Sequence, residues 1–163
     1  MEPCRVWTIG HSTRTLEQFL GLLNAHDIEA VADVRRYPGS RRWPHFAREN
    51  LAAALTACGL CHVWLPELGG RRKPSPDSPN TAWRNAAFRG YADYMASEPF
   101  AEGLGRLADL ACGFRTAIMC AEALWWRCHR GLPSPQGQGE IACESTDYGG
   151  SGYASSRGVA GAA

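Results

Sequence analysis

The side chains best suited to chemistry in this sequence cluster between positions 120 and 130. Cys120 follows an apolar run and precedes a predicted helix that begins near Glu122. A thiol beside a helix N-terminus and arginines has its thiolate form favoured, so Cys120 could act as a nucleophile or a redox-active group. Glu122 and His129 could move protons, and Arg130 could clamp an anion. We therefore predict that Cys120, Glu122 and His129 are catalytic, the alternative for the thiol being an inert core position.

A basic segment supplies a second group of candidates. Between Asp33 and Lys73 the sequence has eight basic side chains against three acidic ones, although the net charge of the whole chain is only +1. Such a local excess is typical of an anion site or a nucleic-acid contact. We predict that the substrate-binding residues are His11, Ser12, Asp33, Arg35, Ser40, Arg41 and Arg130.

Four short apolar runs predict the strands that position these residues, at 5–9, 28–34, 61–65 and 115–120. Apolar residues at helical spacing lie between them. This alternation predicts a single α/β domain with a mostly parallel sheet and helices on both faces. The candidate polar residues follow the carboxyl ends of the predicted strands, where parallel sheets bind their ligands.

The chain changes character after Arg130. Residues 131–163 contain eight Gly, five Ser and two Pro and show no apolar periodicity. We predict an α/β domain over 1–130 and a weakly structured tail over 131–163, so that the C-terminal part of the fold is truncated or altered. A sheet strand would then be missing, and apolar surface would be exposed beside the fourth strand.

Composition limits the classes of protein that this chain can be. No apolar run approaches the roughly 20 residues of a membrane span, and the first residues have no signal-like apolar stretch. We expect a cytoplasmic protein without a membrane partner, in which the seven cysteines are reduced thiols. No cofactor or metal ion is expected. A zinc site using Cys120, Cys128, His11 and His129 remains an alternative that the spacing does not favour.

Taken together, the motifs of this sequence resemble the family called domain of unknown function 488, over about residues 5–130. The resemblance implies an α/β domain of a cytoplasmic protein with these polar motifs at a shared site, and it supplies no activity. The sequence departs from the family pattern after Cys-His-Arg, where Gly131, Pro133 and Pro135 interrupt the expected helix. The motifs are Thr8-Ile-Gly-His-Ser12, Asp33-Val-Arg35 with Pro38, Ser40 and Arg41, Pro44-His-Phe46, Pro66-Glu-Leu-Gly-Gly70, Phe88-Arg-Gly-Tyr91, Cys120-Ala-Glu122 and Trp126-Arg-Cys128-His-Arg130.

Two functional hypotheses follow. The first is a small enzyme acting on an anionic substrate, phosphate-bearing or nucleotide-like, through a site around Cys120, Arg35 and Arg41. The alternative is a non-catalytic module that binds nucleic acid or a nucleotide. It would use the same basic segment, with Trp43, Phe46 and Trp64 stacking on the ligand. The sequence sets no oligomeric state.

Overall fold

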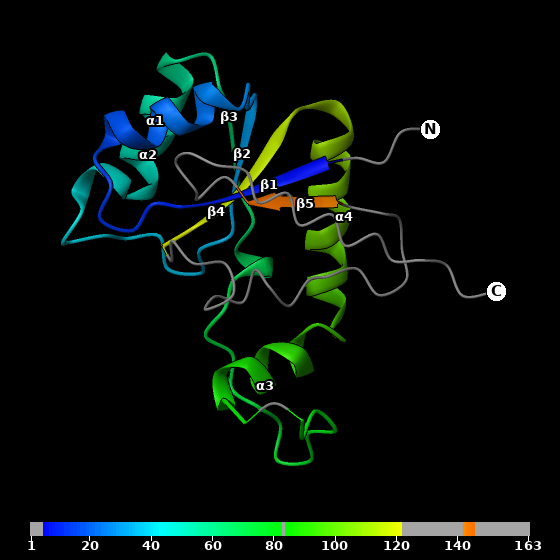
Figure 1. The fold of residues 1–163 in the computed structure, drawn as a ribbon. Coiled ribbons are helices and arrows are strands. Elements are labelled where there is room, and N and C mark those ends of the chain that lie inside the picture. The colour runs from blue at the N-terminus through cyan, green and yellow to red at the C-terminus, as the bar shows by residue number, and fades with distance from the viewer. Residues whose placement is uncertain (1–4, 83, 122–141, 146–163) are drawn as a thin grey trace.

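The computed structural model of the chain describes residues 5–82, 84–121 and 142–145 and forms one α/β unit (Figure 1). Two short 3₁₀ helices, η1 and η2, precede α2 and α3 in the chain. The strands are β1 (Arg5–Gly10), β2 (Ala30–Asp33), β3 (Cys61–Trp64), β4 (Thr116–Cys120) and β5 (Ala142–Ser145). The helices are α1 (Leu16–Ala25), η1 (Pro44–Phe46), α2 (Arg48–Ala57), η2 (Pro66–Leu68), α3 (Ala86–Tyr94) and α4 (Glu98–Gly113).

The five strands form one sheet in the order β3-β2-β4-β1-β5, and every neighbouring pair is parallel. β4 lies in the middle, between β2 and β1, and all five of its residues are buried. The predicted single domain with a mostly parallel sheet is therefore confirmed.

Alternate side chains of the strands enter two separate apolar cores, because successive residues of a strand point to opposite faces. On one face the strands pack against α1 and α2, and on the other against η2 and α4 (Figure 1), with Tyr91 of α3 joining the second core. Ile9 and Met119 belong to the first core, and Val6 and Ile118 to the second. The helices thus cover both faces of the sheet, as the alternating pattern predicts.

Local capping explains where two of the helices begin. The Thr15 hydroxyl accepts from the Gln18 amide while the Gln18 side chain accepts from the Thr15 amide, which is the capping box that the sequence predicts. The Asn85 side chain accepts from the amides of Ala87 and Phe88 at the start of α3. Among the described helices, none is long and apolar enough to cross a membrane.

The structure corrects three expectations about the end of the chain and its cysteines. Residues 142–145 form β5 beside β1, so a strand that we expected to be missing is present; backbone pairing does not require an apolar sequence. No apolar surface is exposed at β4, because the strand order places it in the centre. Cys112 is disulfide-bonded, whereas Cys58, Cys61 and Cys120 are free; spacing alone does not reveal which cysteines a fold brings together.

Candidate anion-binding site at the carboxyl edge of the sheet

The register of the strands brings several predicted site residues to one edge of the sheet. Gly10 of β1 pairs with Cys120 of β4, and Asp33 of β2 pairs with Met119 of the same strand. The chain beyond β1 continues this pairing, because the His11 amide donates to the Cys120 carbonyl over 3.0 Å and the Ser12 amide to that of Ala121 over 3.0 Å. Ser12 has a φ of 43°, a left-handed conformation that turns the chain sharply away from the sheet.

Arg35 is bound to Asp33 by a buried two-pronged ion pair. Its Nε donates to Asp33 Oδ1 over 2.9 Å and its Nη2 to Oδ2 over 2.7 Å, while its Nη1 donates to the Phe46 carbonyl over 2.6 Å. The arginine is 7% exposed and the aspartate fully buried. We conclude that this arginine holds the loop after β2 against η1, and that it is not an open clamp for a ligand.

The carboxylate of Asp33 stays ionised in this buried position. Burial by itself would raise its pKa, but the hydrogen bonds and the charge of Arg35, together with the nearby His62 ring, outweigh burial and hold the pKa below its ordinary value. His62 Nε2 lies 3.6 Å from Asp33 Oδ2. A depressed carboxyl pKa means that the ion pair stabilises the fold above pH 3.8 and weakens only as the pH falls through the lower, folded value.

His11 is buried against aromatic side chains. Its ring stacks on that of Phe46 with centroids 4.5 Å apart, and its Nδ1 lies 3.0 Å from the Ser12 carbonyl oxygen. Burial, with a smaller contribution from the charge of Arg35, outweighs the Ser12 hydrogen bond and lowers the pKa of His11 from 6.5 to about 4. At neutral pH the imidazole is therefore uncharged.

This lowered pKa predicts a loss of stability in acid. Between pH 6.5 and about 4 the unfolded chain binds a proton at His11 and the folded chain does not. The free energy of unfolding should therefore fall across this range by on the order of 2 to 3 kcal/mol. Urea unfolding followed by circular dichroism at several pH values measures this, with His11→Gln as the variant that cannot titrate. Parallel pH profiles for wild type and variant would show that His11 is not responsible.

Cys120 lies at the carboxyl end of β4 with its side chain in the core formed with α3 and α4, where it is 3% exposed. Such burial limits access to the thiol and favours packing over nucleophilic attack. The other predicted catalytic residues, Glu122 and His129, and the predicted anion ligand Arg130 lie outside the described residues. The catalytic assignments therefore stay predictions.

The loop after β2 carries the remaining predicted site residues. Ser40 accepts from the Trp43 amide over 2.9 Å, so its hydroxyl shapes the turn before η1. Arg41 is exposed, and no hydrogen bond or ion pair fixes its side chain among the contacts of the described residues. Phe46 is fully buried between the rings of Phe19 and His11, so it cannot stack on a ligand.

A basic groove of about 600 Å³ lies where this loop meets the segment after η2. Four cationic side chains line it, against one carboxylate. Cavities of this size accommodate small ligands such as nucleotides. Its lining residues are Arg36, Tyr37, Arg71, Arg72, Lys73, Ser75, Gly90, Asp93 and Tyr94.

Hydrogen bonds from two arginines fix one wall of the groove. Arg72 donates to the carbonyls of Gly69 and Pro66, both over 3.2 Å, and its guanidinium lies 3.7 Å from the ring centroid of Tyr94. Arg36 Nη1 donates to the Arg71 carbonyl over 3.0 Å. The side chains of Arg71 and Lys73 are exposed, so these two cations are the most accessible to an anion.

Asp93 of α3 ties down the other wall. Its carboxylate accepts from the Ser75 amide over 2.8 Å, from the Ser78 hydroxyl over 2.6 Å and from the Asn80 amide group over 2.7 Å. The hydrogen bonds from Ser78 and Asn80 lower the pKa of this carboxyl group. Because its oxygens are already engaged, Asp93 organises the loop, and as an ionised carboxylate it offsets one of the four positive charges of the groove.

Close backbone contact also requires a glycine on α3. A Cβ on Gly90 would lie 2.1 Å from the Arg72 carbonyl oxygen and 2.6 Å from the Pro74 nitrogen. The loop that carries Arg71, Arg72 and Lys73 can therefore rest on α3 only because position 90 has no side chain.

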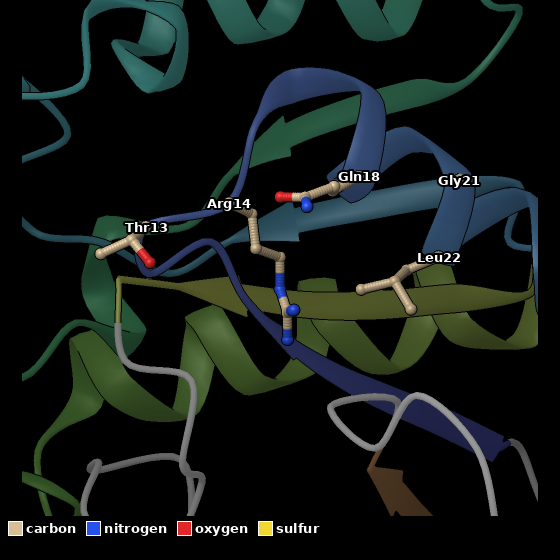
Figure 2. Close-up of a pocket in the computed structure, with 5 residues that line it drawn as sticks. All are labelled: Thr13, Arg14, Gln18, Gly21 and Leu22. Carbon is tan, nitrogen blue, oxygen red and sulfur yellow. The ribbon is translucent and has the colours of Figure 1, made fainter.

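A second cavity, of about 420 Å³, lies beside α1 and is lined by Thr13, Arg14, Gln18, Gly21 and Leu22 (Figure 2). Its single guanidinium, that of Arg14, extends towards β1 and donates from Nε to the Gly10 carbonyl over 3.0 Å. With one cation already engaged, this cavity is less suited to an anion than the basic groove. Among the described residues, no three His, Cys, Asp or Glu side chains gather as metal ligands would.

The sequence did not lead us to predict the groove as a site, although its excess of basic residues pointed to this region. The excess of basic residues before position 73 includes Arg36, Arg71, Arg72 and Lys73. What the sequence does not show is that the segment after η2 folds back beside Arg36, a contact that depends on Gly69 and Gly90.

The fold and this edge define a class of protein: an α/β domain with a parallel sheet and a basic groove beside the carboxyl ends of its strands. The model of the family described as "Domain of unknown function DUF488" matches residues 15–132, well over half of the chain. The chain belongs to this family, which confirms the resemblance found in its sequence. No curated protein and no solved structure matches it.

Proposed function

We propose that this protein binds a phosphate-bearing anion in the basic groove between the loop after β2 and the segment after η2. The observation that carries the proposal is the convergence of Arg36, Arg71, Arg72 and Lys73 on one cavity of about 600 Å³. Guanidinium and ammonium groups are the side chains that recognise phosphate, and arginine can do so with two parallel hydrogen bonds.

The two exposed cations provide the test. We expect the double variant Arg71→Gln/Lys73→Gln to bind inorganic pyrophosphate at least tenfold more weakly than wild type in isothermal titration calorimetry. A hydrogen bond to a charged group contributes about 1.5 to 3 kcal/mol, and two are removed. Neither side chain is buried, so the fold should be unchanged.

The matched control is Arg106→Gln, which removes an exposed arginine of α4 that does not line the groove. This variant should bind pyrophosphate within twofold of wild type. Equal binding by the double variant and wild type, or no binding by wild type, would refute the proposal.

A second candidate is an enzyme that acts on the bound anion through Cys120. It is favoured by the position of this cysteine at the carboxyl end of the central strand, where parallel sheets bind their ligands. Alkylation with iodoacetamide followed by mass spectrometry tests it. From their exposure we expect Cys58 to react in the native protein and Cys120 to be protected until urea unfolds it. Rapid native modification of Cys120 would instead support the enzyme.

A further inference from the structure

Arginine–aromatic pairs accompany the basic groove along the carboxyl edge of the sheet. In each pair a guanidinium lies over a ring, an arrangement that presents both positive charge and an aromatic surface to a ligand. The pairs are Arg72 with Tyr94 (3.7 Å to the ring centroid), Arg48 with Trp64 (4.2 Å), Arg36 with Tyr37 (5.3 Å) and Arg42 with Trp43 (5.5 Å).

Three of these pairs are physically connected. The indole Nε1 of Trp64 donates to the Arg35 carbonyl over 2.8 Å, which places this ring beside the loop that carries Arg36. The Arg48 amide donates to the Pro38 carbonyl of the same loop over 3.2 Å. Arg36 in turn reaches the Arg71 carbonyl. These contacts place the three pairs next to one another, from the end of β3, past the loop after β2, to α3, and we call this series of residues the strip.

Tyr37 is the most open ring of this strip. It is 61% exposed and lines the groove together with Arg36. The other large apolar side chain that is exposed in the described part of the chain is Phe114, which lies at the opposite edge, before β4. The Arg36 guanidinium lies 5.3 Å from the centroid of the Tyr37 ring, so an exposed ring and a cation lie together at one point of the strip.

We propose that the phosphate-bearing ligand is a single-stranded nucleic acid that lies along this strip. The inference rests on the proposed function and names its ligand class. The strip joins three elements and extends beyond the groove, so it offers contacts to several successive nucleotides. Single strands are bound in this way, with phosphates in a basic groove and unpaired bases on aromatic rings, whereas a duplex keeps its bases stacked on one another.

Fluorescence anisotropy with a labelled oligothymidylate of about twelve nucleotides, within the usual range of site sizes, tests the proposal. We expect binding that weakens steeply with salt, and at least fivefold weaker binding of a hairpin duplex with the same number of phosphates. Tyr37→Ala should weaken oligonucleotide binding at least fivefold, since base stacking contributes about 1 to 3 kcal/mol per base.

Two control variants complete the design. Tyr37→Phe keeps the ring and should bind the oligonucleotide nearly as wild type does. Phe114→Ala removes an exposed ring far from the strip and should have no effect. Pyrophosphate binding without oligonucleotide binding would overturn this inference and leave the proposed function standing. Failure of both ligands would overturn both, and a duplex bound as tightly as the single strand would overturn the choice of ligand.

Discussion

Replacing Asp33 with Asn should destabilise the protein by about 3 to 5 kcal/mol, the usual cost of removing one partner of a buried ion pair. The variant keeps the shape of the side chain but leaves the guanidinium of Arg35, only 7% exposed, without its counter-charge. It also replaces Oδ2, the acceptor of Arg35 Nη2, with an amide nitrogen that cannot accept a hydrogen bond. Urea unfolding at pH 7, followed by circular dichroism, measures the loss.

The control for this substitution is Asp109→Asn, the same chemical change at an exposed position of α4. It should alter the free energy of unfolding by less than about 0.5 kcal/mol. A double variant that also carries Arg35→Met should be less destabilised than the sum of the single variants, because no buried charge is then left unpaired. A loss below about 1 kcal/mol for Asp33→Asn would contradict the importance of the ion pair.

Replacing Gly90 with Ala should abolish pyrophosphate binding while leaving most of the fold intact. The added Cβ would meet the Arg72 carbonyl oxygen at 2.1 Å and the Lys73 carbonyl carbon at 2.6 Å, and backbone atoms cannot move aside without moving the loop. Displacing that loop separates Arg71 and Lys73 from Arg36. Calorimetric titration with pyrophosphate, beside a circular dichroism spectrum of the variant, measures both effects.

Gly105→Ala is the matched substitution in α4, because a Cβ there meets nothing within 4 Å. Glycine is a poor helix former, so this variant should gain up to about 1 kcal/mol of stability and bind pyrophosphate as wild type does. Normal pyrophosphate binding by Gly90→Ala would show that binding does not depend on the present position of the segment after η2.

The sequence predicted the elements of the fold well, because each leaves a local pattern. The capping box at Thr15 and the apolar strand ending at Cys120 are examples. It could not predict the strand order, which depends on contacts between distant segments and placed β4 in the centre. It also could not separate Arg35, which is buried in an ion pair, from Arg36, which lines the groove, although the two are neighbours in sequence.

The sequence predicted which polar residues lie together at one edge of the sheet, but not their contacts, and their functional roles stay predictions. His11, Ser12, Asp33, Arg35 and Cys120 do gather at one edge, as expected for residues that follow parallel strands. Whether each side chain faces solvent depends on packing that only the folded chain defines. The groove lies beside these residues and is built mainly by the segment after η2. This segment is rich in proline and glycine and has no apolar periodicity from which its position could be predicted.

The central position of β4 has a consequence for how the chain folds. Val6 of β1 pairs with Thr116, and Arg5 pairs with Ala142, so β1 finds its partners only after the long segment up to Thr116 has been synthesised. β2 and β3 can pair much earlier, since Ala30 pairs with Cys61. Contacts between such distant segments require the closure of long loops, which slows folding. β1, an apolar strand, must therefore remain unpaired in the nascent chain until β4 has been synthesised. During this period the chain depends on protection from aggregation.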